Sequence, residues 1–172
     1  MYKRQTLISI AAGLTLSDLK HLADSENQPI IRVMPNINAQ IGQSTSAIVK
    51  NEFVDDSAYA TVQEIFKSTG SVHEIAEKDF STFAAIAGSS PAFIYMFIDA
   101  MARAGVLHGI PKDQATAIVA ETVRASAEMI LQSSENPWSL VDKVSSPGGT
   151  TVAGVVSLEQ NHFIGTVIDA IS

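Results

Sequence analysis

The sequence of 172 residues contains no cysteine and few charged side chains. Without cysteine, disulfides, thiolate nucleophiles and cysteine-ligated metal sites are excluded. Charged residues make up 17% of the chain, whereas soluble domains average about 25%. A surface this short of charge predicts that a partner covers part of it. Basic residues are the scarcer kind, and the net charge of −7 argues against nucleic acid as a partner, because such binding requires a basic face.

The sequence also lacks an uninterrupted apolar segment. Its most apolar region, residues 83–107, contains Pro91, Asp99 and Arg103, whereas a membrane-spanning helix needs about 20 predominantly apolar residues. The apolar run near residue 8 is short and leads into a helix-start pattern, unlike a signal peptide. We therefore expect a cytoplasmic protein without a membrane partner.

Metal-ligand motifs are missing as well. The four histidines are scattered, and none of them has the spacing of a metal site. No nucleophile elbow of a hydrolase is present either. No metal is therefore predicted.

The first part of the chain alternates strand and helix patterns. Apolar, β-branched segments predict four strands, at residues 6–12, 29–35, 46–51 and 71–76. Helix patterns lie between them, one starting after Thr15 as N-cap and one spanning residues 56–68. The first strand is apolar on both faces, which is typical of a parallel sheet covered by helices.

After Glu77 every segment has a helical pattern, so we place a domain boundary near Ala76 and expect domains at 1–76 and 77–172. Residues 92–107 form a helix that is apolar almost all round and must be covered on several sides. The following helix opens with Pro111 and has one apolar face. The patterns therefore predict an α/β region followed by an all-α region.

Two stretches rich in glycine or serine are candidates for a functional site. "VSSPGGTTVAG", residues 144–154, places two glycines before a helix whose first backbone N–H groups lack partners inside the helix. With the helix dipole, this arrangement forms a small anion site that suits a carboxylate better than a triphosphate. The same residues also suit a plain turn and helix cap. "AGSSPAF", residues 87–93, predicts either a break that places hydroxyls in a cleft or an N-cap followed by proline.

Four segments together resemble the pyrroline-5-carboxylate reductase family. "LVDKVSSPGGTTVAGVVSLE" resembles the family signature, and "AGSSPAFIYMFIDAMARAGVLHGIP" resembles its first core helix. "RVMPN" and "LISIAAG" are similar to parts of its cofactor domain. The resemblance implies that the fold is an α/β remnant of a Rossmann-like sheet followed by an all-α dimerisation domain. Residues 1–76 would form a partial dinucleotide-binding domain, and residues 77–172 a helical substrate-binding domain that interlocks with a second subunit in a homodimer or higher homo-oligomer. It also implies hydride transfer from NADPH or NADH to the C=N carbon of 1-pyrroline-5-carboxylate, which yields L-proline.

The resemblance further implies roles for individual residues. The substrate carboxylate would contact the Ser146 hydroxyl and the backbone of Gly149, Thr150 and Thr151, and the catalytic Thr151 hydroxyl would reach the ring nitrogen. The other positions matched to family contacts are Glu77 and Lys143 on the substrate side, and Ile10, Ala11, Ala12 and Asn36 on the cofactor side. Lys143 stands where relatives often have asparagine. Ile10, Ala11 and Ala12 would lie at the end of the first strand and Asn36 after the second, where ligands of α/β sheets bind.

The chain differs from the family in one large respect, because none of its ten glycines forms a G-x-G-x-x-G phosphate loop. We expect it to start partway through the cofactor domain and to stop slightly short at the other end. The first strand would then form an open sheet edge. The expected function is a truncated reductase; the alternatives are a non-catalytic dimerisation module and a paralogue acting on another small imine.

Overall fold

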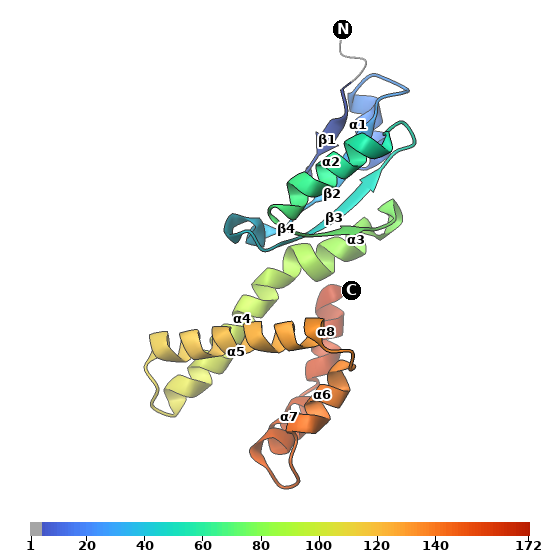
Figure 1. The fold of residues 1–172 in the computed structure, drawn as a ribbon. Helices are drawn as coiled ribbons and strands as arrows, with labels where there is room; N and C mark the ends of the chain where they lie inside the picture. Colours follow the sequence, from blue (N-terminus) through green and yellow to red (C-terminus); the bar gives the residue numbers. More distant parts are fainter. Residues whose placement is uncertain (1–4) are drawn as a thin grey trace. The chain divides into compact units, whose positions relative to one another are not determined.

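The computed structural model describes residues 5–172, in which a small sheet with helices is followed by a series of helices (Figure 1). The chain divides into two compact units, one ending at Pro91 and the other spanning Ala92–Ser172. We call them the sheet unit and the helical unit. This order confirms the predicted fold class, α/β followed by all-α.

The sheet has four strands in the order β1-β2-β3-β4. Their bounds are β1 Leu7–Ser9, β2 Ile30–Met34, β3 Ser44–Lys50 and β4 Gly70–Glu74. β1 is parallel to β2 and β3 is parallel to β4, whereas β2 and β3 are antiparallel. Among the strands that the structure describes, β1 pairs only with β2 and stands at the edge, with Ile8 41% exposed. The predicted open edge is therefore present.

Two helices make the crossovers that parallel strand pairs require. α1 (Leu16–Leu22) joins β1 to β2 and begins with the predicted Thr15 cap, completed by Asp18 as a capping box. α2 (Asp56–Lys67) joins β3 to β4 and is capped by Asp55. Figure 1 shows α2 lying along the sheet. The core on this side is formed by Ile31, Val33, Ile48, Val54, Tyr59 and Val62.

The opposite face of the sheet is covered by the segment that starts at Glu77. It consists of the 3₁₀ turn η2 (Glu77–Asp79), the short helix α3 (Phe80–Phe83) and the π-helical η3 (Ala84–Ser89). Phe80, Phe83 and Ala87 are buried there against Ala47 of β3. Because this packing includes residues up to Ala87, the sheet unit ends at Pro91, whereas the sequence pattern places the domain boundary at Ala76.

The Ser-Ser-Pro stretch does not interrupt the helix. η3 leads directly into α4 (Ser90–Leu107), and the Ser90 hydroxyl donates to the Ala85 carbonyl at 2.9 Å. A π turn shifts the hydrogen-bond register, so the missing N–H of Pro91 is tolerated within the run. Both expectations for this stretch, a break and an N-cap, are therefore wrong.

Gly70 is required at the start of β4. Its φ is +147°, and a Cβ there would lie 2.0 Å from the Ser44 carbonyl oxygen. The close approach of β3 and β4 therefore depends on the absence of a side chain. The helix before it, α2, ends at Lys67 with Ser68 as its C-cap, within one residue of the predicted end.

The helical unit contains most of α4 and all of the later helices. These are α5 (Lys112–Gln132), α6 (Pro137–Val144), α7 (Thr150–Gln160) and α8 (Phe163–Ile171). Only Ala102, Ala115 and Val119 are buried hydrophobic residues in this unit. On the predicted apolar face of α5, Ile118 and Met129 stay 48% and 58% exposed. The expected helices have formed, but their apolar faces lie open in a single chain.

One helical stretch, Glu77–Leu107 with 31 residues, is long and apolar enough by length and composition to cross a membrane. A helix whose apolar surface is covered by further protein is expected to have the same composition. Figure 1 shows that its first turns are those that pack on the sheet.

Candidate functional site

The carboxyl end of β1 opens into an exposed loop. The sequence pattern predicts a strand over residues 6–12 with Ile10, Ala11 and Ala12 at its end, but β1 ends at Ser9 and these three residues follow it. All three are exposed, Ile10 by 62%. The Ala11 N–H donates to the Ser9 hydroxyl at 3.3 Å. The small side chains leave room for a flat ligand at this end of the strand. We call residues 10–15 the β1–α1 loop.

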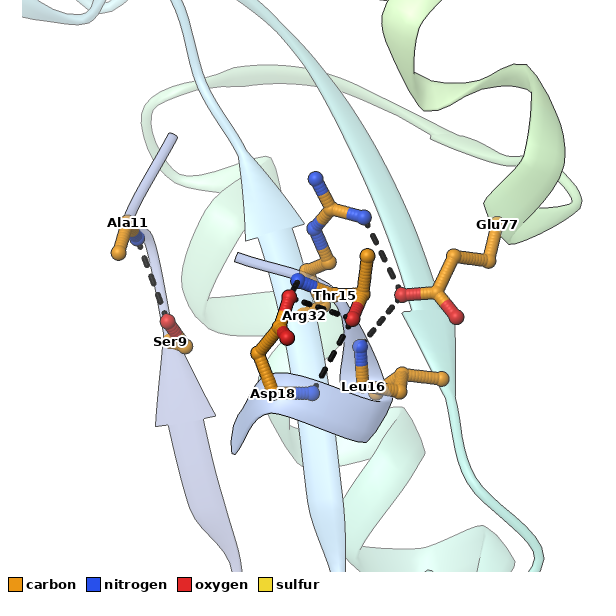
Figure 2. Close-up of polar contacts among 7 residues, drawn as sticks. All are labelled: Ser9, Ala11, Thr15, Leu16, Asp18, Arg32 and Glu77. Atoms are coloured by element: carbon orange, nitrogen blue, oxygen red, sulfur yellow. Dashed lines mark hydrogen bonds and ion pairs between the residues drawn. The ribbon is translucent and has the colours of Figure 1, made fainter. Parts of the chain in front are cut away.

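Glu77 contacts the first residue of α1, directly after this loop (Figure 2). Its Oε1 accepts a hydrogen bond from the Leu16 N–H at 2.6 Å and another from Nη1 of Arg32 at 3.1 Å. The Leu16 amide is the first of α1 and has no partner inside the helix. The carboxylate of Glu77, predicted on the substrate side, is thus engaged by the protein itself.

Arg32 is the residue that sequence reasoning missed. It lies in β2 with its side chain only 6% exposed, and its guanidinium stands 4.3 Å from the ring centroid of Phe80. Its Nε is buried, and no acceptor among residues 5–172 pairs with it. Arginine is almost never buried unless paired. A charged residue in the apolar strand "IIRVM" was therefore a signal for a distant acidic partner.

The capping box of α1 orders the end of the loop. The Thr15 N–H and hydroxyl donate to the Asp18 carboxylate at 2.9 and 2.7 Å, and the Asp18 N–H donates back to the hydroxyl at 3.1 Å. These hydrogen bonds, chiefly the one from the Thr15 hydroxyl, hold the pKa of Asp18 below its ordinary value. Asp18 therefore stays charged at the positive end of the α1 dipole.

Asn36 lies just after β2, as predicted, but its amide is used within the protein. It caps the 3₁₀ turn η1 (Ile37–Ile41) by accepting from the Asn38 N–H at 3.2 Å, and it also accepts from the Thr45 N–H at 3.4 Å. Its Nδ2 donates to the Ala87 carbonyl of η3 at 3.0 Å. Asn36 thus joins the end of β2 to the π-helical segment.

The glycine-rich loop brings the predicted carboxylate contacts together before α7. Gly148 has φ +70°, a left-handed conformation that favours glycine. The Gly149 N–H donates to the Ser146 carbonyl at 2.9 Å, so this amide is not free. Among residues 5–172, no partner accepts from the N–H groups of Thr150 and Thr151, and α7 has no side-chain cap. The open donors therefore begin at Thr150.

Lys143 lies in the last turn of α6, ahead of the loop. Its Nζ pairs with Glu135 Oε1 at 2.5 Å. Both residues line an apolar groove of about 850 Å³ between α5 and α6. The ammonium is thus partly neutralised before any ligand arrives.

The predicted residues form two groups. The sheet unit contains the cofactor-side residues and one substrate-side residue, namely Ile10, Ala11, Ala12, Asn36 and Glu77. The helical unit contains the remaining substrate-side residues, namely Lys143, Ser146, Gly149, Thr150 and Thr151. In the described part of the chain, no group of three or more metal-ligating side chains is found.

A family model for pyrroline-5-carboxylate reductase dimerisation matches residues 77–172. Among curated relatives, the pyrroline-5-carboxylate reductase of Escherichia coli (strain K12) is 41% identical over 99% of this chain and 63% of its own length. That of Aquifex aeolicus (strain VF5) is 39% identical over 96% and 62%. The chain therefore spans about three fifths of the length of the curated relatives it matches.

Solved structures agree. The 1-pyrroline-5-carboxylate reductase of Streptococcus pyogenes matches 98% of this chain and 64% of its own, with TM-score 0.91 and 47% identity. A Plasmodium falciparum pyrroline carboxylate reductase with NADP bound matches 97% and 67%, with TM-score 0.90 and 36% identity. The chain belongs to the pyrroline-5-carboxylate reductase family.

Proposed function

We propose that this chain acts in the reduction of 1-pyrroline-5-carboxylate to L-proline, with NADPH or NADH as hydride donor. Family membership supports the reaction class, and the open amides of Thr150 and Thr151 are the observation that carries the proposal. Two unpartnered N–H groups at the positive end of α7 suit one small carboxylate. The substrate is an acid of this kind.

On the substrate side, each residue of the loop receives a role. The amides of Thr150 and Thr151 hold the carboxylate, the Ser146 hydroxyl supplements them, and the Thr151 hydroxyl reaches the ring nitrogen. Gly149 suits the tight turn before α7, because a Cβ there would lie 3.1 Å from the Ser146 carbonyl oxygen. Lys143 and Glu77 stand near the substrate by resemblance, although both are already in ion pairs.

On the cofactor side, the end of β1 suits a nicotinamide, because Ile10, Ala11 and Ala12 are exposed and two of them are small. Asn36 supports this edge through its bonds to η1 and η3. A bound nicotinamide supplies the hydride. The residues of the chain contribute positioning of the imine carbon and exclusion of water, with no obligatory acid side chain.

We also propose that the chain assembles as a homodimer or higher homo-oligomer through residues 77–172, with a domain boundary near Ala76 and a cytoplasmic location. The match of the dimerisation family model to residues 77–172 and the open apolar faces of the helical unit support this assembly. The net charge of −7 supports the absence of a nucleic-acid partner. We likewise propose no membrane partner.

The sharpest test removes one amide and leaves the fold intact. Thr150 is the first residue of α7, where proline is well tolerated, and Gly149 has the extended conformation (φ −80°, ψ 169°) that precedes proline readily. Thr150→Pro deletes the N–H, whereas the matched control Thr150→Ala deletes the side chain and keeps the N–H. Turnover of 1-pyrroline-5-carboxylate with NADPH is measured for both.

We expect Thr150→Pro to lower kcat/KM by about tenfold or more relative to Thr150→Ala, the worth of one hydrogen bond to a charged group. Equal kcat/KM for the two variants would contradict the carboxylate site. If the wild-type chain forms a dimer but has no turnover, the non-catalytic dimerisation module replaces the reductase. Turnover of another imine in preference to this acid favours the paralogue.

A further inference from the structure

The loop that follows β1 is ordered mainly from its two ends. The Ser9 hydroxyl holds Ala11 at the start, and the Thr15–Asp18 capping box holds the other end (Figure 2). Between these contacts the loop is exposed and includes Gly13 at φ +82°. Glycine in the left-handed region loses much conformational freedom on ordering. A contact from outside the loop reaches Leu16, the residue directly after it.

That contact comes from Glu77, which lies 61 residues beyond Leu16 in the sequence. We propose that Glu77 is a positioning residue, whose carboxylate holds the β1–α1 loop in the conformation in which Ile10, Ala11 and Ala12 meet the nicotinamide. This role rests on the proposed function. It differs from the direct substrate contact that the family resemblance implies for the same side chain.

The geometry requires one acceptor to serve two donors. Oε1 of Glu77 receives the Leu16 N–H at 2.6 Å and Nη1 of Arg32 at 3.1 Å. The Leu16 amide is otherwise an orphan of the first helical turn. The carboxylate also lies at the positive end of the α1 dipole. Its negative charge and the hydrogen bond that it accepts from Leu16 therefore both stabilise this contact.

Arg32 anchors this contact in the rigid part of the sheet. Its side chain is 6% exposed, lies against the Phe80 ring and projects from β2, whose neighbours Ile31 and Val33 are in the core. A buried guanidinium cannot move without losing these contacts. Glu77 therefore transmits the position of β2 and of the segment starting at residue 77 to the β1–α1 loop.

Two other readings of Glu77 make different predictions. If the carboxylate only neutralises Arg32, its removal lowers stability but leaves loop order unchanged once stability is restored. If it contacts the substrate, its removal raises the KM for 1-pyrroline-5-carboxylate. The positioning role predicts a loosened loop and weaker binding of the nicotinamide.

The first experiment measures amide hydrogen exchange by NMR in the full chain. Glu77→Ala removes the acceptor, and Glu77→Gln keeps a neutral acceptor in the same place. Asp79→Ala is the matched control, since Asp79 is an exposed acid of the same 3₁₀ turn that makes no side-chain contact to α1 among the described residues. Because Glu77→Ala leaves Arg32 unpaired, an Arg32→Met/Glu77→Ala variant removes both charges, and Met can still contact Phe80.

We expect the Leu16 amide to exchange about tenfold faster or more in Glu77→Ala, which is the loss of one charge-assisted hydrogen bond. The loop amides from Ala11 to Thr15 should follow, Glu77→Gln should restore much of the protection, and Asp79→Ala should match the wild type. The double variant should keep the fast exchange of the loop even where its global stability recovers. Wild-type exchange of these amides in the folded double variant would overturn the proposal.

The second experiment separates this role from the proposed function. NADPH binding is titrated with the same proteins, and KM is compared for both substrates wherever turnover persists. A raised KM or Kd for NADPH with an unchanged KM for the imine supports positioning, and the reverse pattern overturns it. If the wild-type chain binds no NADPH while the exchange pattern holds, the proposed reductase activity fails and Glu77 still positions the loop.

Discussion

The two units of this chain bury their apolar residues to very different extents. In the sheet unit, Ile30, Ile31 and Ile48 are fully buried and helices cover both faces of the sheet. In the helical unit, Met96, Leu107 and Leu131 are 71–81% exposed, although each lies within a well-formed helix. Secondary structure is thus complete in both units, but only the sheet unit supplies its own core.

This difference shows what the helical unit lacks. α4, α7 and α8 line an apolar groove of about 690 Å³, in which the tilted rings of Phe97 and Phe163 lie with centroids 6.1 Å apart. Exposed apolar surface of this kind often marks a protein–protein interaction site. A second copy that seats its own apolar helices there is the cover we propose, in accord with the dimerisation family model.

The largest effect is expected from a charge placed in this groove. Phe97→Asp should abolish self-association, because a carboxylate would be buried without a partner and the ring would be lost, at a cost of ~3 kcal/mol or more per subunit. Ile65→Asp is the control, since Ile65 is 53% exposed on α2 of the sheet unit. Sedimentation velocity at micromolar concentration checks both. A dimer that survives Phe97→Asp would place the interface elsewhere.

A second prediction, with a smaller effect, distinguishes the core that one chain supplies by itself from a core that two subunits share. Ile48→Ala, at a position with 0% exposure, should lower the free energy of unfolding by about 2–5 kcal/mol. Because the sheet unit supplies this core, the loss should not depend on protein concentration. Ile118→Ala, 48% exposed in one chain, should show a loss that grows with dimer formation. Urea denaturation at two protein concentrations measures both variants. If Ile118→Ala lowers the free energy of unfolding equally at both concentrations, the contrast between the two units is refuted.

The smallest effect concerns Asp99, which lies on α4. Hydrogen bonds from Lys112 and then Arg103 hold the pKa of Asp99 below its ordinary value. A depressed carboxyl pKa stabilises the fold above the pKa of the unfolded chain, and this contribution is lost as pH falls through the folded pKa. Asp99→Asn should therefore lower Tm slightly at pH 7 and not at pH 2–3. Thermal melts across pH 2–7 test this. A difference in Tm between the wild type and Asp99→Asn that persists at pH 2–3 would exclude ionic pairing as its cause.

The sequence predicts local features of the fold well. Thr15 and Asp18 lie at capping-box spacing, and the four strands show β-branched apolar runs, so both features depend on neighbouring residues alone. The π turn before Pro91 was not predictable in this way. It arises because packing of Phe80 and Phe83 on the sheet keeps the run helical through a residue without an N–H.

The candidate site was predictable in position but not in its contacts. The open amides at Thr150 and Thr151 follow from helix-end chemistry, whereas the engagement of Gly149 with Ser146 depends on the turn that Gly148 forms. The pairing of Arg32 with Glu77 joins residues far apart in sequence, which only the fold brings together. The open edge at β1 was predicted from the comparison with the family, whereas the apolar pattern of this strand alone is typical of a covered parallel strand.

The contrast between the units is tested most directly by the mass of the wild-type chain in solution. Sedimentation equilibrium from about 1 to 100 μM, with far-UV circular dichroism of the same samples, measures association and helix content together. We predict a dimer or larger assembly over this range, with full helix content. A monomer that keeps its helices and its stability at all of these concentrations would contradict the claim that a second copy completes the helical unit.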